Sequence, residues 1–241
     1  MNGRAVREGI ASAFRGDQFK PTVILFLAPF LMVAWRYFGD PKYLAAAIPD
    51  ACVLWDDRPA TGAVVSFVAG FVLLGLIPAL LVRFLFHERL ADYGVSIGNK
   101  VRTLRAILVL CPCFILAGYV ASTDPAVQAQ YPINPSAGRS PGMFAIHAAT
   151  YLLFYLGWEF HFRGFLQLGI RRRLGDVNAL WVQVLASGLL HIGRPASETF
   201  ASLLAGLLWG ILVFRTRSLL SGLMQHYVLG ISLDWFLCYA R

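Results

Sequence analysis

Seven long apolar segments run along the chain, separated by short loops that collect most of its charged residues. A helix needs about 20 apolar residues to cross a bilayer. The segments that approach or reach that length are Thr22–Phe38, Gly62–Phe86, Val101–Ala121, Met143–Leu168, Val177–Ile192, Ser197–Phe214 and Ser218–Leu237. The pattern predicts an all-α fold, a polytopic membrane helical bundle with seven transmembrane helices, or eight as the alternative.

Two other stretches are expected to lie outside the spans. Leu44–Trp55 is apolar but too short to cross a bilayer, so we expect a re-entrant or interfacial piece. Ser122–Gly142 is rich in proline, glycine and polar residues, and we expect a connector rather than a lid. No polar stretch is long enough to fold by itself, so residues 1–241 are predicted to form a single integral membrane domain.

The composition and the placement of charge agree with this picture. The chain is 58% hydrophobic and 14% charged, whereas soluble domains are about 25% charged. The net charge of +8 does not indicate a nucleic-acid partner, because the basic residues lie in short loops between apolar segments. Loops on the N-terminal side hold 15 basic residues and loops on the opposite side hold 6. The two sets are Arg4, Arg7, Arg15, Lys20, Arg83, Arg89, Lys100, Arg102, Arg105, Arg163, Arg171, Arg172, Arg173, Arg215 and Arg217, against Arg36, Lys42, Arg58, Arg139, Arg194 and Arg241. This excess predicts a cytoplasmic N-terminus and an outer C-terminus.

Three ionisable side chains interrupt the apolar segments: Glu159, His191 and His226. A charged group at the bilayer centre costs about 2.5–3.5 kcal/mol on insertion scales. Such groups persist where they face a cavity, pair with one another or take part in chemistry. One carboxylate and two imidazoles can hold a water or a metal ion, which makes an intramembrane hydrolase the leading hypothesis.

The depth of these residues bears on whether they can meet. With about 1.5 Å of rise per residue, Glu159, His226 and His191 lie about 16, 12 and 20 Å from the cytoplasmic ends of their segments. All three depths fall inside a hydrocarbon core of about 30 Å. The spread of about 8 Å requires tilted or kinked helices before the side chains come together.

Arg163 and the three remaining histidines are predicted to have supporting or structural roles. Arg163 follows Glu159 by four residues, so the two share a helix face, and the arginine is expected to neutralise and orient the carboxylate. His161 points to a different face. We expect His147 to lie near the outer surface and His87 to be solvated.

Two acidic residues, four glycines and the four cysteines also receive predicted roles. Asp234 lies roughly on the His226 side of its helix, two turns further out, where it orients a partner or caps a polar cavity. Glu198 is expected to be a helix-start carboxylate. Gly206, Gly210, Gly222 and Gly230 permit close helix packing. The four cysteines are Cys52, Cys111, Cys113 and Cys238, and we expect small buried side chains at each.

Three short motifs surround the ionisable residues: WEFHFRGF at 158–165, SGLLH ending at His191, and HYVLG starting at His226. With FRTRSLLSGLMQH before the last of them and ERLADYGVSIG before the third span, they resemble the CPBP family. This family comprises CAAX-protease and bacteriocin-processing intramembrane proteases related to the prenyl-protein endopeptidase Rce1. The resemblance covers Ala91–Trp235 as a protease core, residues 91–235, and is best over Gly157–Trp235.

Three positions depart from the family pattern. The family carries a Glu-Glu pair, and the first glutamate, usually assigned as the catalytic base, is Trp158 here. Ser187 stands where Phe is common, and Gly230 stands where Asn is common, which removes a polar ligand for the catalytic water. The segment HIGRPASE looks like a branch of the family that shares the WEF motif.

The resemblance implies an intramembrane endopeptidase in which Glu159 is the general base on a water positioned by His191 and His226. Arg163 would orient Glu159. The alternative is a metalloendopeptidase with zinc bound by the two histidines and Glu159 as third ligand or base. The resemblance also implies membrane-embedded or lipid-anchored peptide substrates. We expect an integral protein of the bacterial inner (cell) membrane, in contact with the lipid bilayer.

Two other function classes remain open at this stage. A catalytically inactive relative that binds membrane peptides or a partner protein is motivated by Trp158 and Gly230. A transporter, with intramembrane Glu and His forming a proton or metal path, is the less favoured alternative, because the chain shows no inverted repeat.

Overall fold

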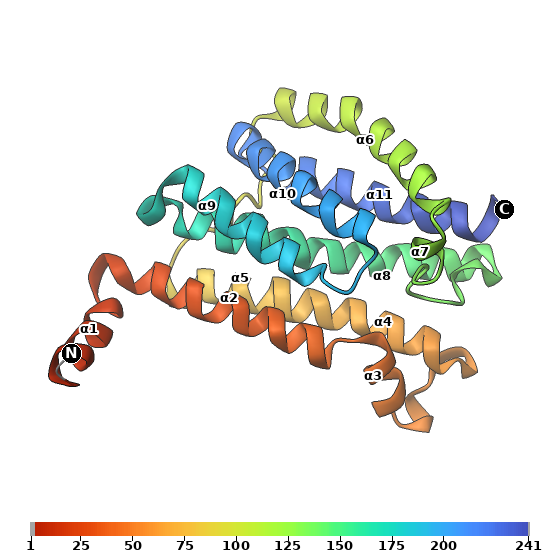
Figure 1. The fold of residues 1–241 in the computed structure, drawn as a ribbon, viewed down its shortest axis with the longest axis horizontal. Helices are drawn as coiled ribbons and strands as arrows, with labels where there is room; N and C mark the ends of the chain where they lie inside the picture. Colours follow the sequence, from red (N-terminus) through yellow and green to blue (C-terminus); the bar gives the residue numbers. More distant parts are fainter. Residues whose placement is uncertain (1–2, 241) are drawn as a thin grey trace.

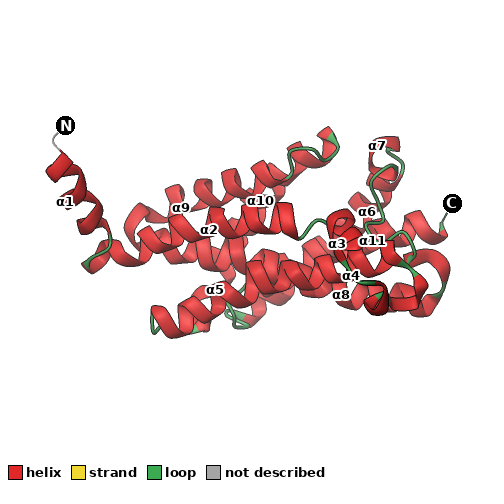
Figure 2. Cartoon of the chain, turned by 90° about the horizontal axis from the view of Figure 1, so that it is seen from below, coloured by secondary structure: helices red, strands yellow, loops and turns green. Residues whose placement is uncertain are grey.

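The computed structural model describes residues 3–240, and within that range the secondary structure is helical (Figure 2). The long helices are α2 (Phe19–Phe38), α4 (Arg58–Gly70), α6 (Lys100–Ser122), α8 (Pro141–Glu159), α9 (Gly169–Leu190), α10 (Ala196–Thr216) and α11 (Leu220–Tyr239). Shorter helices are α1 (Gly3–Ala13), α3 (Pro41–Ala47), α5 (Ile77–Leu80) and α7 (Pro125–Gln128). π-helical segments cover Phe71–Leu76, Leu81–Leu85 and Phe160–Leu168 and join their neighbours without a break. All seven apolar segments predicted from the sequence are therefore helical.

Four helices are long and apolar enough to cross a membrane: Gly16–Phe38, Arg58–Leu85, Lys100–Ser122 and Ala196–Thr216. They carry exposed apolar side chains such as Phe26, Phe30 and Leu204, as lipid-facing surfaces require. Together they support an integral membrane protein. The total of seven or eight spans, which adds α8, α9 and α11, stays a prediction.

The helix α8 and the π segment that continues it lie at the centre of the bundle (Figure 1). Every residue from 157 to 167 is buried. A helix that is buried on all sides must be covered by neighbours, and here α4, α9, α11 and α2 pack against it. Helix α6 lies on the outside against α11 and is mostly exposed. The Glu159 motif thus occupies the best-covered part of the fold.

Helix α9 is broken near its start, at Gly175. The predicted fifth span, Val177–Ile192, corresponds to the part of the helix after this break. Gly175 has φ of 77° and ψ of 162°, a backbone conformation outside the helical region that side chains with a Cβ rarely adopt. The helical residues before it, from Gly169 onward, continue directly from the π segment. The long run that reaches His191 starts directly after this break, close to the predicted start at Val177.

The two stretches expected to lie outside the spans contain no long helix. Residues 44–55 form the end of α3 and two short 3₁₀ turns. Residues 122–142 hold α7 and one 3₁₀ turn between α6 and α8. Arg241, counted with the outer basic residues, lies outside the described residues, as do Met1 and Asn2.

Candidate active site

Glu159 is the central polar group of the bundle. It is the last residue of α8, directly before the π segment, and its side chain is 1% exposed. The Nη1 of Arg163 donates to its Oε1 at 3.2 Å, and the Nδ1 of His226 lies 2.7 Å from the same oxygen. The predicted pairing of Glu159 with Arg163 is therefore confirmed. The second carboxylate oxygen, Oε2, is buried without a hydrogen-bond partner among the described residues.

Aromatic side chains hold His226 in place. Its ring stacks on Trp209 with centroids 4.3 Å apart and meets the edge of Tyr155 at 4.5 Å. The indole Nε1 of Trp209 donates to Gln225 Oε1 at 3.1 Å, which fixes the stacking surface. With its Nδ1 on Glu159, the His226 imidazole is constrained on three sides.

His191 caps the C-terminal end of α9 and is anchored by its own helix. Its Nδ1 lies 2.7 Å from the carbonyl oxygen of Ser187, one turn earlier. Its carbonyl accepts a hydrogen bond from the Thr199 hydroxyl at 2.8 Å, which ties this end of α9 to the start of α10. The ring meets the edge of Trp158 with centroids 5.5 Å apart.

A cavity of about 1110 Å³ lies against this group, at the end of the bundle that carries α3 and α7. Tyr155, Trp158, His191 and His226 line it, and Glu159 does not. The carboxylate therefore lies behind His226, while both histidines face the open space. Trp158, which replaces the first glutamate of the family pair, contacts both histidine rings and forms the wall between them.

The anchoring contacts fix the protonation of the two rings. A carbonyl oxygen and a carboxylate are acceptors, so the Nδ1 of each histidine carries the proton and donates. The neutral ring then presents an unprotonated Nε2. Neither Nε2 has a hydrogen-bond partner within residues 3–240, so both are available to a molecule in the cavity.

The predicted zinc set does not fit this geometry. Glu159 contacts the Nδ1 side of His226, and a metal on the free Nε2 would lie on the opposite side of the ring. In the described part of the chain no three His, Cys, Asp or Glu side chains are grouped to hold a metal ion.

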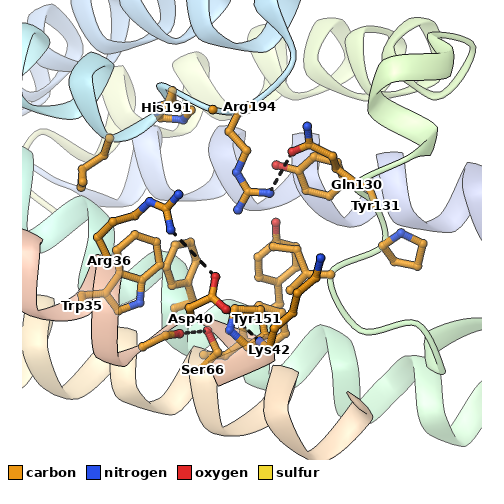
Figure 3. A pocket seen from close by; sticks show the side chains of 18 of the residues that line it. Trp35, Arg36, Asp40, Lys42, Ser66, Gln130, Tyr131, Tyr151, His191 and Arg194 are labelled. Atoms are coloured by element: carbon orange, nitrogen blue, oxygen red, sulfur yellow. Dashed lines mark hydrogen bonds and ion pairs between the residues drawn. The ribbon is translucent and has the colours of Figure 1, made fainter. Parts of the chain in front are cut away.

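Basic side chains line part of the cavity. Arg36, Lys42 and Arg194 are labelled in Figure 3, and Arg36 lies 3.8 Å from the carboxylate of Asp40, which also lines the cavity. The guanidinium of Arg194 lies 5.4 Å from the centre of the Tyr131 ring. Burial alone would lower the pKa of Arg194, but the nearby Tyr131 and Glu198 raise it, so this cation stays charged.

Glu198 has a place beyond the one predicted for it. It does lie in the first turn of α10, as expected. It also lines the cavity and accepts a hydrogen bond from the Tyr131 hydroxyl at 2.8 Å. Burial raises the pKa of that hydroxyl, so Tyr131 remains a donor.

The structure corrects two of the minor predictions. His147 is not at a surface: it is fully buried, and its Nε2 lies 2.8 Å from Asp234 Oδ2. Asp234 therefore does orient a partner, but that partner is His147 rather than a residue of the His226 site. None of the four cysteines is buried: Cys52 and Cys113 are exposed, and Cys111 and Cys238 are half-buried.

Two other histidines lie away from the site. His161 is buried on another face, beside the backbone of Ala28 and Leu74. His87 is exposed, as predicted.

Comparison with known families gives one match, and it covers the part of the chain that holds the site. Residues 140–231 match the family described as type II CAAX prenyl endopeptidase Rce1-like. The resemblance predicted from the three motifs is confirmed over this range, and the match supports a protease function of the CAAX-type intramembrane kind. The matched segment contains Glu159, Arg163, His191 and His226. No curated protein and no solved structure matched the chain.

Sequence reasoning missed Tyr155, which contacts His226 and lines the cavity. It precedes Glu159 by four residues and therefore shares its helix face, a spacing that could have singled it out. The basic side chains of the cavity were also missed as part of the site, because they come from α2, α3 and the loop after α9, which are far apart in the sequence.

Proposed function

We propose that this chain is an intramembrane endopeptidase that hydrolyses peptide bonds of membrane-associated substrates. The observation that carries the proposal is a histidine with a buried carboxylate behind it and a cavity in front of it. This arrangement of Glu159 and His226 is the one that turns an imidazole into an efficient general base. The match of residues 140–231 to the Rce1-like family supports peptides as the substrate.

The water is the nucleophile in this proposal. It lies in the cavity, held by the Nε2 atoms of His226 and His191, and gives its proton to His226 as it attacks the carbonyl carbon. Glu159 accepts the Nδ1–H of His226 and stabilises the imidazolium that forms. The sequence analysis assigned Glu159 as the general base on the water. In this proposal His226 is the base, and Glu159 acts on His226. Arg163 holds the carboxylate ionised and in position.

Peptide binding without hydrolysis is the second candidate, and Trp158 favours it. An indole in the wall between the two histidines replaces a carboxylate that the family usually carries, and it gives the cavity an apolar lining. A protein of this kind would bind a membrane peptide against Trp158 and release it unchanged.

Cleavage of a membrane-peptide panel by the purified protein in detergent separates the two. We expect wild type to cut, and we expect Glu159→Gln, His191→Ala and His226→Ala to lose about 10²–10⁴-fold in kcat. His87→Ala is the matched control, because that histidine is exposed and away from the cavity. The same reactions repeated with a chelator test whether cleavage depends on a metal ion. Equal cleavage by wild type and the three site variants would refute the assignment.

A further inference from the structure

The two histidine rings present acceptors to the cavity, yet hydrolysis of a peptide also needs a donor beside the attacked carbonyl group. As water adds to the carbonyl, negative charge develops on the carbonyl oxygen and must be stabilised by a hydrogen-bond donor. His191 and His226 offer unprotonated Nε2 atoms to the cavity. Arg163 is buried and does not line the cavity. The inference below rests on the proposed function and concerns this missing donor.

Tyr155 lies where such a donor is required. Its ring contacts His226 edge-on at 4.5 Å, and the side chain lines the same cavity. It comes from α8, one turn before Glu159, so it belongs to the buried helix face that carries the carboxylate. The rigid central helix fixes its position relative to both members of the pair.

Gly230 locates the Tyr155 hydroxyl more closely. A Cβ added at Gly230 would collide with the Tyr155 Oη and come within 2.9 Å of its Cζ. Gly230 follows His226 by four residues on α11, so it shares the helix face one turn further along. The hydroxyl thus occupies the space that a side chain at position 230 would fill, beside the His226 imidazole.

The hydroxyl also has hydrogen-bonding capacity to spare. The ring of Tyr151 lies beside it, with its centroid 4.6 Å from that of Tyr155, so the Tyr151 hydroxyl is the neighbouring donor. A phenol has one donor and acceptor lone pairs. When Tyr151 donates, the O–H of Tyr155 is free to donate into the cavity.

We propose that Tyr155 is a catalytic residue that donates a hydrogen bond to the substrate carbonyl oxygen. The water oxygen bonds to the carbonyl carbon as its proton passes to His226 Nε2. The C=O electron pair moves to the oxygen that Tyr155 holds. When the intermediate collapses, the C–N bond breaks, and His226 returns the proton to the leaving amine nitrogen. Tyr155 keeps its own proton throughout.

Tyr155→Phe tests this directly, because phenylalanine keeps the ring and its packing and removes only the hydroxyl. We expect kcat to fall about 10²–10³-fold, with KM unchanged. Tyr227→Phe is the matched control: Tyr227 is a neighbour on α11, donates to the Ala148 carbonyl at 3.2 Å and does not line the cavity. It should leave kcat unchanged.

Gly230→Ala is a second test, because it displaces the Tyr155 hydroxyl without removing it. The added methyl group should push the hydroxyl away and lower kcat. Its effect should be smaller in the Tyr155→Phe background than in wild type, because the hydroxyl is then gone and only the ring, with Cζ at 2.9 Å, remains to be displaced. Cleavage by wild type with undiminished kcat in Tyr155→Phe would overturn the role of Tyr155 and leave the proposed function standing. Absence of cleavage by folded wild type would overturn both.

Discussion

The carboxylate of Glu159 serves two partners with one oxygen. Its Oε1 accepts from Arg163 and from His226, and the whole group is removed from solvent. Removing one partner of a buried charge pair typically costs about 3–5 kcal/mol, because the remaining charge is left uncompensated. Arg163 is therefore expected to be needed for folding as much as for chemistry.

Arg163→Met tests this dependence. The variant should lower the unfolding free energy by about 3–5 kcal/mol, because it leaves the Glu159 carboxylate without its cation. Combining it with Glu159→Gln should restore most of the stability, since both charges are then absent, but cleavage should stay lost. Thermal unfolding in detergent, with cleavage measured in parallel, checks both statements. A double variant no more stable than Arg163→Met alone would contradict the pairing.

At this scale the sequence predicts contacts within one helix better than contacts between helices. The pairing of Glu159 with Arg163 follows from their spacing of four residues. Which nitrogen of His226 meets the carboxylate depends on side-chain rotamers and on Trp209, which lies on a different helix. No spacing along the chain carries that information.

Among the elements, α10 shows how glycine brings helices together around the site. The side-chain amides of Gln183 and Gln167 donate to the Gly206 and Gly210 carbonyls, both at 2.9 Å. A Cβ at Gly210 would lie 2.8 Å from atoms of both glutamines. Close backbone approach at small residues is a common way to pack helices in membranes. The predicted packing role of these glycines has a concrete basis here.

Gly210→Ala should separate α10 from α9 and the π segment. We expect a loss of about 1–3 kcal/mol in unfolding free energy from overpacking, measured by thermal unfolding in detergent. Gly142→Ala is the control, because a Cβ there would meet only the Ser140 hydroxyl, at 3.8 Å. Equal stability of the two variants would show that α10 does not pack as described.

The apolar pattern predicts the seven long helices but not their internal irregularities. Hydropathy depends on residue type averaged over a window, and it is the same for α- and π-helical turns. The three π segments arise from how α4 and α8 fit their neighbours, and one of them starts directly after Glu159. Insertions of this kind are frequent at functional sites.

On the scale of the whole molecule, folding creates a cavity whose walls come from distant parts of the chain. The motifs that the sequence singles out supply His191 and His226, and the end of α2 and the loop after α9 supply Arg36 and Arg194. The sequence singles out Glu159, His191 and His226, and their catalytic roles stay a prediction. It does not predict that Glu159 lies behind His226, because burial depends on how all the helices close around α8. The orientation of the N-terminus stays a prediction from charge.

The most direct test of the central claim is to follow the oxygen of water into a product. Purified wild type would be incubated with a membrane peptide in water labelled with ¹⁸O, and the fragments analysed by mass spectrometry. We predict a fragment with ¹⁸O in its new C-terminal carboxyl group, formed by wild type and not by His226→Ala. Peptides that bind to folded wild type but are recovered intact and unlabelled would contradict the account and establish binding without hydrolysis.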